Sequence, residues 1–242
     1  MSRTLVIGDI HGGLRALHQV LEKAKVSPDD KLIFLGDYVD GWSDSPKVID
    51  FLIELEQSHQ CFFIRGNHEE MVFRWLSAGD DNAEWRFHGG QSTVDAYRDL
   101  DIHTKDRHIA FLDRLNDFYI DEQNRLFIHA GFTNQKGVHY EFFRGMFCWD
   151  RTLWETALSL NPALSPEDQF YPKRLTLYTE IFIGHTPVTR IGSTVPVNKA
   201  NLWNVDTGAA FKGRLTIMDV DSKDFWQSDP LNELYIDERG RN

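Results

Sequence analysis

The sequence has 242 residues, of which 41% are hydrophobic and 26% charged, so it is long enough for one large α/β domain or two small ones with a full core. Its formal net charge of −11 argues against a duplex nucleic-acid partner, because such a partner requires a basic face. No apolar run reaches the length of a membrane span, and the first apolar stretch is too short for a signal peptide. We therefore expect a cytoplasmic protein with no membrane partner, whose two cysteines, Cys61 and Cys148, are reduced thiols.

The first part of the sequence predicts alternating strands and helices. Apolar runs predict buried parallel strands over 5–7, 32–35 and 61–64. Helical spacing predicts connecting helices over 13–25 and 46–58, the second with Pro46 in its tolerant first turn. Strand–helix–strand units bring the carboxyl ends of their strands to one edge of the sheet, where open α/β sheets bind ligands.

The pattern changes after Glu69. A helix is expected over 70–78, followed by a helical cap inserted over about 80–124, with helices near 92–100 and 106–116. Such a cap could shape substrate access or serve packing alone, and the sequence does not separate these alternatives.

The core resumes beyond this insertion, and the whole sequence, 1–242, is expected to form a single domain. Strands are predicted over 125–131 and 181–183, followed by two strands with antiparallel character over 202–206 and 214–220, joined by a turn over 207–213. Residues from about 222 to 242 are expected to form a polar C-terminal tail, anchored by Trp226 and Tyr235.

Side chains that bind metals follow the predicted strands at their carboxyl ends. These residues are Asp9, His11, Asp37, Asn67, His129 and His185. Carboxylate, imidazole and amide oxygen suit borderline divalent ions such as Mn²⁺, Fe²⁺ or Zn²⁺. Asp37 is central enough to bridge two ions, and two ions about 3.5–4 Å apart form a clamp for displacement at phosphorus. One such motif alone means little, but its recurrence after successive strands favours a metal site.

The sequence resembles the calcineurin-like metallophosphoesterases through a set of motifs in a fixed order. They read GDIHG at 8–12, GDYVD at 36–40, RGNHE at 65–69, HAG at 129–131 and GHT at 184–186. Within that superfamily the chain is most similar to the phosphoprotein phosphatase branch, and to its small bacterial and phage-type serine/threonine phosphatases, with further support from CWDR at 148–151. The resemblance implies two facing mixed β-sheets flanked by helices, a four-layer α/β fold around a dinuclear metal centre.

The resemblance also implies roles for individual residues. Asp9 and His11 are expected to hold one ion and Asp37 to bridge, while Asn67, His129 and His185 hold the other. His68 is the expected general acid for the leaving oxygen, and Asp40 is expected to orient it and raise its proton affinity. Mn²⁺ is the first choice for both ions, with Fe or Zn as alternatives.

The substrate-binding residues are expected to be Arg151, Arg65 and Asn67, because a guanidinium fork suits phosphoryl oxygens. One departure from the phosphoprotein phosphatase pattern affects this expectation. The position after Asp40 is usually an arginine that grips phosphate, and here it is Gly41, followed by Trp42. Trp42 could stack on a nucleotide base, or it could only pack the loop.

Three functions follow as hypotheses. The first is a phosphomonoesterase acting on phosphoserine or phosphothreonine in proteins, by direct attack of a metal-bridging hydroxide. The alternative is a hydrolase of dinucleoside polyphosphates, such as diadenosine tetraphosphate, or of another nucleotide. A catalytically idle metal-binding scaffold is the least favoured, because every expected ligand is present together with Asp40 and His68. The sequence does not define the oligomeric state.

Overall fold

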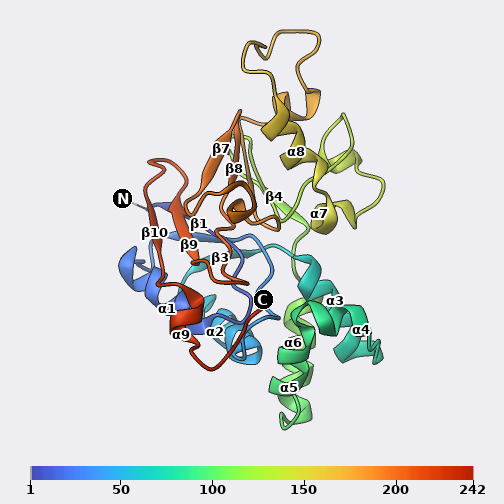
Figure 1. Cartoon of the computed structure of the whole chain (residues 1–242), viewed down its shortest axis with the longest axis vertical. Helices are drawn as coiled ribbons and strands as arrows, with labels where there is room; N and C mark the ends of the chain where they lie inside the picture. The colour runs from blue at the N-terminus through green and yellow to red at the C-terminus, as the bar shows by residue number, and fades with distance from the viewer. Residues whose placement is uncertain (1, 242) are drawn as a thin grey trace.

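The computed structural model describes residues 2–241, which form two facing 5-stranded mixed sheets with helices on their outer faces (Figure 1). The first sheet has the order β10-β9-β1-β2-β3. Its strands are β1 (Thr4–Ile7), β2 (Lys31–Phe34), β3 (Gln60–Phe63), β9 (Thr216–Asp219) and β10 (Phe225–Gln227). β1, β2 and β3 are parallel, as predicted, while β9 and β10 are antiparallel.

The second sheet has the order β4-β5-β6-β8-β7. Its strands are β4 (Phe118–Ile120), β5 (Arg125–Ile128), β6 (Glu180–Ile183), β7 (Val197–Lys199) and β8 (Leu202–Asn204). The facing sides of the two sheets share a buried apolar layer in which Val6 and Ile33 meet Phe127 and Phe182. The predicted pair of facing mixed sheets is confirmed.

The helices α1 (Leu14–Lys23) and α2 (Ser45–Leu55) are the predicted crossovers of the first sheet. The region of the predicted cap contains α4 (Ala83–Trp85), a π-helical turn (Arg86–Gly90), α5 (Gln91–Ala96) and α6 (Ile102–Asp113). With α3 (Asn67–Ala78), these helices gather at one side of the molecule, and α6 packs on α2 and α3 (Figure 1). The predicted insertion ends earlier than expected, because β4 is already an edge strand of the second sheet.

The remaining helices are short. α7 (Met146–Trp149) and α8 (Thr152–Ser159) lie on the second sheet's side of the molecule (Figure 1), and α9 (Leu231–Leu234) lies near the C-terminus. Single 3₁₀ turns occupy Val138–Tyr140, Lys173–Thr176 and Val188–Ile191. No helix in residues 2–241 combines the length and the apolar character needed to cross a bilayer. Both cysteines are free thiols, as expected.

The prediction of two adjacent antiparallel strands over 202–206 and 214–220 is wrong in its pairing. β8 pairs with β6 and β7 in the second sheet, whereas β9 pairs with β1 in the first, so the segment between them crosses from one sheet to the other. Alternating polarity marks a strand with one buried face, but it does not specify the partner strand.

The predicted polar tail is also structured. Phe225–Gln227 extends the first sheet as β10, and Tyr235 is buried against the core, as its predicted role as an anchor requires. Trp226 packs on the same core and is partly buried. Beyond α9 the chain, red in Figure 1, turns back toward the centre of the molecule.

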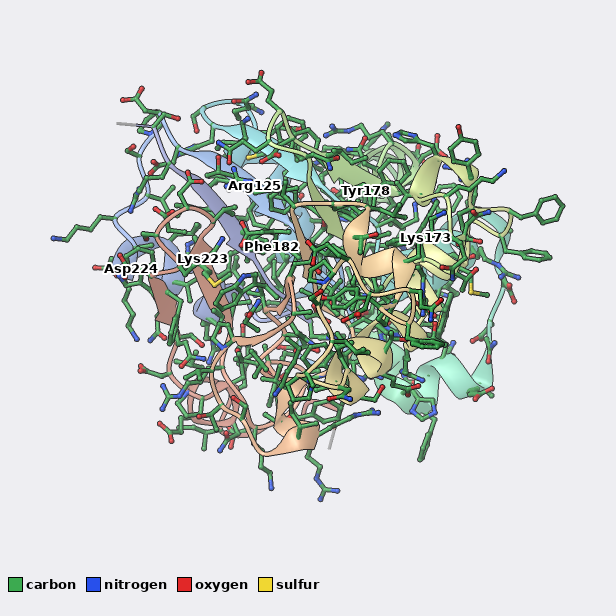
Figure 2. The ribbon with its side chains drawn as sticks, turned by 90° about the horizontal axis from the view of Figure 1, so that it is seen from above. Arg125, Lys173, Tyr178, Phe182, Lys223 and Asp224 are labelled. Atoms are coloured by element: carbon green, nitrogen blue, oxygen red, sulfur yellow. The ribbon has the colours of Figure 1, made fainter. Side chains whose placement is uncertain are left out.

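A polar seam joins the two sheets beyond the end of β9. Arg125 of β5 forms an ion pair with Asp221, and Lys223 pairs with Glu180 at 2.6 Å. Figure 2 labels Phe182 and Lys223, and the ammonium of Lys223 lies 5.1 Å from the centre of the Phe182 ring. These contacts fix the relative position of the sheets whose strand ends build the site.

Candidate active site

The structure brings the predicted metal-binding residues together. Asp9 and His11 follow β1, Asp37 follows β2, and Asn67 begins α3 directly after β3. His129 and His185 follow β5 and β6 of the second sheet. All of them are buried except His185, which is partly exposed. The carboxyl ends of parallel strands from both sheets therefore meet at one place, as expected for α/β folds.

Asp37 lies between two groups of imidazoles. Its Oδ2 is 3.5 Å from Nε2 of His11, and its Oδ1 is 3.4 Å from Nε2 of His129. Two clusters with metal-ligand spacing share this carboxylate, namely His11, Asp37 and His68, and Asp37, His129 and His185. A carboxylate with one oxygen toward each cluster has the geometry of a bridging ligand.

Asn67 and Asp9 complete the two groups. Oδ1 of Asn67 lies 3.2 Å from Nε2 of His129 and 3.0 Å from Nδ1 of His185. The carboxylate of Asp9 accepts a hydrogen bond from the backbone N–H of His185 at 3.0 Å, and its Oδ2 is 3.9 Å from Nε2 of His11. Asp9 thus lies between a residue of the first sheet and one of the second.

The site is built to receive cations. Burial, together with the negative charges of Asp206 and Asp37, raises the pKa of Asp9 well above its usual value, and burial also raises the pKa of Asp37. Nε2 of His185 is buried, and no described group bonds to it. Divalent ions would relieve both features, because they stabilise ionised carboxylates and coordinate neutral imidazole nitrogens. The residues present therefore fit a metal centre.

His68 and Asp40 form a buried pair beside this cluster. Nδ1 of His68 lies 2.6 Å from Oδ2 of Asp40, while its Nε2 faces Oδ2 of Asp37 at 4.0 Å. Asp40 also accepts hydrogen bonds from Nε1 of Trp85 and Oγ1 of Thr93, each at 2.6 Å. Burial raises the pKa of Asp40 to about 7, although the hydrogen bonds from Thr93 and Trp85 act to lower it. Burial also lowers the pKa of His68 well below its usual value.

Trp85 and Thr93 connect the inserted helices to the active site. Both belong to the insertion, and both are fully or almost fully buried. Because they hold the carboxylate that bonds to His68, the insertion does more than pack. It orients part of the site, and with Asn82, Glu84 and His88 it also lines the cavity.

The loops that carry these residues are held in strained conformations. His11, Asp37, Asp40 and His185 all have positive φ angles, between 50° and 69°. Left-handed backbone at non-glycine residues is costly and collects at functional sites. Glu69 contributes to the support, since its carboxylate accepts backbone N–H bonds from Asp37 at 2.7 Å and from Tyr38 at 2.6 Å.

Two glycines allow the loops to approach closely. A Cβ at Gly66 would lie 2.2 Å from Oδ1 of Asp37, and a Cβ at Gly184 would lie 2.0 Å from Oδ1 of Asp9. Any larger residue at either position would push a carboxylate out of the cluster.

A cavity of about 630 Å³ opens over the cluster. It is lined by residues from the loops that follow strands of both sheets, from the insertion and from the C-terminal segment, among them Arg74, Arg151, Arg190, Arg241, Trp149 and Phe211. Arg151, a predicted substrate-binding residue, is exposed in this cavity. Asn67, which was also predicted to bind substrate, lines the cavity beside His129 and His185.

The structure does not support the prediction that Arg65 binds substrate, and of the two alternatives for Trp42 it favours packing of the loop. Arg65 does not line the cavity, and its Nη2 donates to the carbonyl oxygens of Asp113 at 3.0 Å and Leu115 at 3.3 Å, at the C-terminal end of α6. Trp42 is fully buried and stacked on Tyr235, with 5.3 Å between ring centroids. It packs the loop, and no base can reach its ring.

Sequence reasoning missed several residues that face the site. Asp206 is buried after β8, and burial raises its pKa to about 6. Its place after an apolar run, in VDTGA, was a usable signal. Arg190 and Arg241 left no such signal, because an arginine in a polar stretch resembles any surface arginine.

Residues 2–209 match the model of the calcineurin-like phosphoesterase family, and the chain belongs to that family. It is therefore a metallophosphoesterase, a hydrolase of phosphoric ester bonds in a family that uses divalent metals, as the motifs predicted.

Among curated relatives, the bis(5'-nucleosyl)-tetraphosphatase PrpE (asymmetrical) of Bacillus cereus is 27% identical over 234 residues, with 88% of each chain covered. Its namesake from Geobacillus thermodenitrificans is 28% identical over 233 residues, again with 88% of each chain covered.

Solved structures show the same fold. A candidate diadenosine tetraphosphatase superposes with a TM-score of 0.63 at 17% identity, covering 93% of this chain and 92% of the other. A serine/threonine phosphatase of Saccharomyces cerevisiae also gives 0.63, at 15% identity, covering 94% of this chain and 80% of the other.

Proposed function

We propose that this metallophosphoesterase hydrolyses dinucleoside polyphosphates of the diadenosine tetraphosphate type. The observation that carries the proposal is the set of arginines in the cavity, Arg151, Arg190 and Arg241, beside the histidine–carboxylate cluster. This positive charge is concentrated in a chain whose net charge is −11. A phosphomonoester presents one dianionic group, whereas a tetraphosphate chain extends several negative charges beyond the reacting phosphorus. Guanidinium groups bind such oxygens in pairs.

An aromatic side chain in the same cavity supports a nucleotide. Trp149 is 44% exposed, and its Nε1 donates to Oε2 of Glu70 at 3.2 Å, which orients the indole. Stacking of a base on an aromatic ring contributes about 1–3 kcal/mol. The names of the curated relatives agree with this substrate class, while the serine/threonine phosphatase reading rests on similarity of fold.

The ligands assigned from the sequence remain our proposal for a dinuclear centre. Asp9, His11, Asp37, Asn67, His129 and His185 would hold two divalent ions, with Mn²⁺ as the first choice and Fe or Zn as alternatives. When bound, these ions supply an activated water nucleophile and neutralise charge on the phosphoryl group.

The protein residues then manage the proton and the position of the substrate. The negative charge of a bound phosphate favours the imidazolium form of His68, which would then offer the leaving oxygen a proton on Nε2, the nitrogen that faces Asp37, while Asp40 accepts a hydrogen bond from Nδ1 and fixes the ring. Arg151 binds phosphoryl oxygens from the exposed side of the cavity.

The test compares diadenosine tetraphosphate with a phosphothreonine peptide, both with added Mn²⁺, by kcat/KM. We expect the dinucleotide to be preferred by at least tenfold, equivalent to about 1.4 kcal/mol in the transition state. Chromatography of the products would show adenosine triphosphate with adenosine monophosphate for asymmetrical cleavage, or only the diphosphate for symmetrical cleavage. A tenfold preference for the peptide would overturn the proposal and restore the protein phosphatase hypothesis.

A further inference from the structure

The C-terminal segment, residues 235–241, runs into the active site and is anchored there on the loop that follows Asp40. Tyr235 stacks on Trp42, and its hydroxyl lies 2.8 Å from Oδ2 of Asp44. The carboxylate of Glu238 accepts hydrogen bonds from the backbone N–H and the hydroxyl of Ser43, at 2.9 and 2.7 Å. The residues after Asp40 thus form a seat for this segment.

The final contacts of this segment direct the side chain of Arg241 into the cavity. Gly240 has a φ of +60°, and a Cβ there would lie 2.6 Å from the Trp42 ring, so only glycine fits between the ring and the backbone. The next residue, Arg241, donates its backbone N–H to the carbonyl of Ala210 at 2.9 Å. Its guanidinium carbon lies 5.5 Å from the centre of the Phe211 ring, which supports the charge by a cation–π contact.

The stem of Arg241 occupies space left by two glycines. A Cβ at Gly89 would lie 2.9 Å from Cγ of Arg241, and a Cβ at Gly41 would lie 3.4 Å from the same atom. The backbone N–H of Gly41 donates to the carbonyl of Gly89 at 3.0 Å, so the two glycines form one bare surface beneath the arginine. Gly41 is the position at which the phosphoprotein phosphatase pattern usually has an arginine.

Arg241 faces the reacting end of the cavity, and within residues 2–241 no carboxylate pairs with its guanidinium. It lines the cavity together with His11, Asp37 and His68. Its Nε is buried and makes no hydrogen bond within residues 2–241, and no ion pair of its guanidinium occurs in that part of the chain. After burial, the charge of Arg241 is the next cause that lowers the pKa of His68, which places the guanidinium near that ring.

We propose that Arg241 binds the phosphoryl group under attack and that the C-terminal segment delivers the guanidinium that Gly41 does not provide. This proposal rests on phosphoester hydrolysis in the cavity described above. The seat over Trp42 and Ser43 positions the segment, and the bare surface at Gly41 and Gly89 lets the side chain of Arg241 reach the substrate. A guanidinium group at this position stabilises the negative charge that develops on the phosphoryl oxygens in the transition state.

The test uses Arg241→Met, which keeps the apolar stem but removes the guanidinium, and Arg239→Met as the matched control. Arg239 is exposed, lies in the same segment and does not line the cavity. The metal content and melting temperature of both variants are first compared with those of the parent. Both variants are then assayed with diadenosine tetraphosphate and with a small aryl phosphate. We expect Arg241→Met to lose about 100-fold in kcat/KM on both substrates and to bind inorganic phosphate about tenfold more weakly, whereas Arg239→Met stays within about threefold.

Chemical rescue separates substrate binding from support of the fold. Free guanidinium ion should restore part of the activity of an Arg241→Ala variant, which a purely structural role does not predict. Activity of Arg241→Met within threefold of the parent on both substrates, or no rescue of a well-folded Arg241→Ala, would overturn the proposal. If the parent hydrolyses the aryl phosphate but not the dinucleotide, only the proposed substrate class fails, and the aryl phosphate still tests Arg241.

Discussion

At the scale of single residues, a direct hydrogen bond to Asp40 sets the orientation of the His68 ring. Asp40 receives hydrogen bonds from His68, Trp85 and Thr93, all at 2.6 Å, so the ring of His68 has one available orientation. With Nδ1 fixed in this way, only Nε2 can face a leaving oxygen. A general acid in such a fixed position typically contributes between 10² and 10⁴ in rate.

Replacing His68 by Gln should therefore lower kcat in a way that depends on the leaving group. We expect a loss of about 100-fold or more for a phosphothreonine peptide, whose alkoxide leaving group must be protonated, and a much smaller loss for an activated aryl phosphate, whose leaving group needs no proton. Steady-state kinetics on both substrates, with metal content determined in parallel, provides the measurement. Equal losses on both substrates at full metal content would contradict the role of general acid.

The residues that could be predicted from sequence share one property. Asp9, Asp37, Asn67, His129 and His185 each stand directly beyond an apolar strand, and strand order in parallel units fixes where such positions meet. Arg65 also follows a strand, but its guanidinium turns away toward α6. Arg241 could not be found in this way, because its position depends on the seat formed by Trp42 and Tyr235, a contact between residues almost two hundred positions apart.

At the scale of elements, the inserted helices and the C-terminal segment close the site from two directions. The insertion holds Asp40 through Trp85 and Thr93, and the C-terminal segment sits on the loop that follows Asp40. The sequence predicted the insertion as helical but could not show what it touched. Its helical pattern records which side is apolar, whereas the two hydrogen bonds to Asp40 depend on single side chains.

Removing one hydrogen bond from the insertion should reduce catalysis without unfolding the protein. Trp85→Phe keeps an aromatic ring in the core but loses the Nε1 donor to Asp40, and we expect kcat to fall about tenfold, within the range of a hydrogen bond to a charged group. Trp75→Phe is the matched control, because Trp75 packs on Trp85 with 5.6 Å between ring centroids and does not contact Asp40. Comparable kcat values for the two variants, at equal melting temperatures, would show that the insertion does not orient the pair.

At the scale of the whole molecule, the candidate metal centre lies where the two sheets meet. The first sheet contributes Asp9, His11 and Asp37, and the second contributes His129 and His185. Ions held between them would link the sheets and also remove the repulsion among buried carboxylates. Metal binding should therefore stabilise the fold as well as enable the reaction.

Chelation and reconstitution would measure this link. We expect the metal-free protein to be inactive and to melt at a lower temperature, and added Mn²⁺ to restore both properties with two ions bound per chain. At a free ion concentration 100 times the dissociation constant, the gain is about 2.7 kcal/mol for each site. Asp37→Asn should lose most of this gain, while Asp29→Asn, at an exposed carboxylate that does not line the cavity, should retain it. Equal thermal shifts in the two variants would argue against Asp37 as the shared ligand.

The pairing of β1 with β9 has a consequence for biosynthesis. β1 is in the middle of the first sheet, and Leu5 pairs with Asp219, so one side of this apolar strand has no partner until more than two hundred further residues have been translated. A nascent chain that has already formed β1, β2 and β3 therefore presents an open hydrophobic edge, which can pair with other chains. Slow translation or premature termination before β9 should convert this enzyme into a substrate for chaperones and proteases.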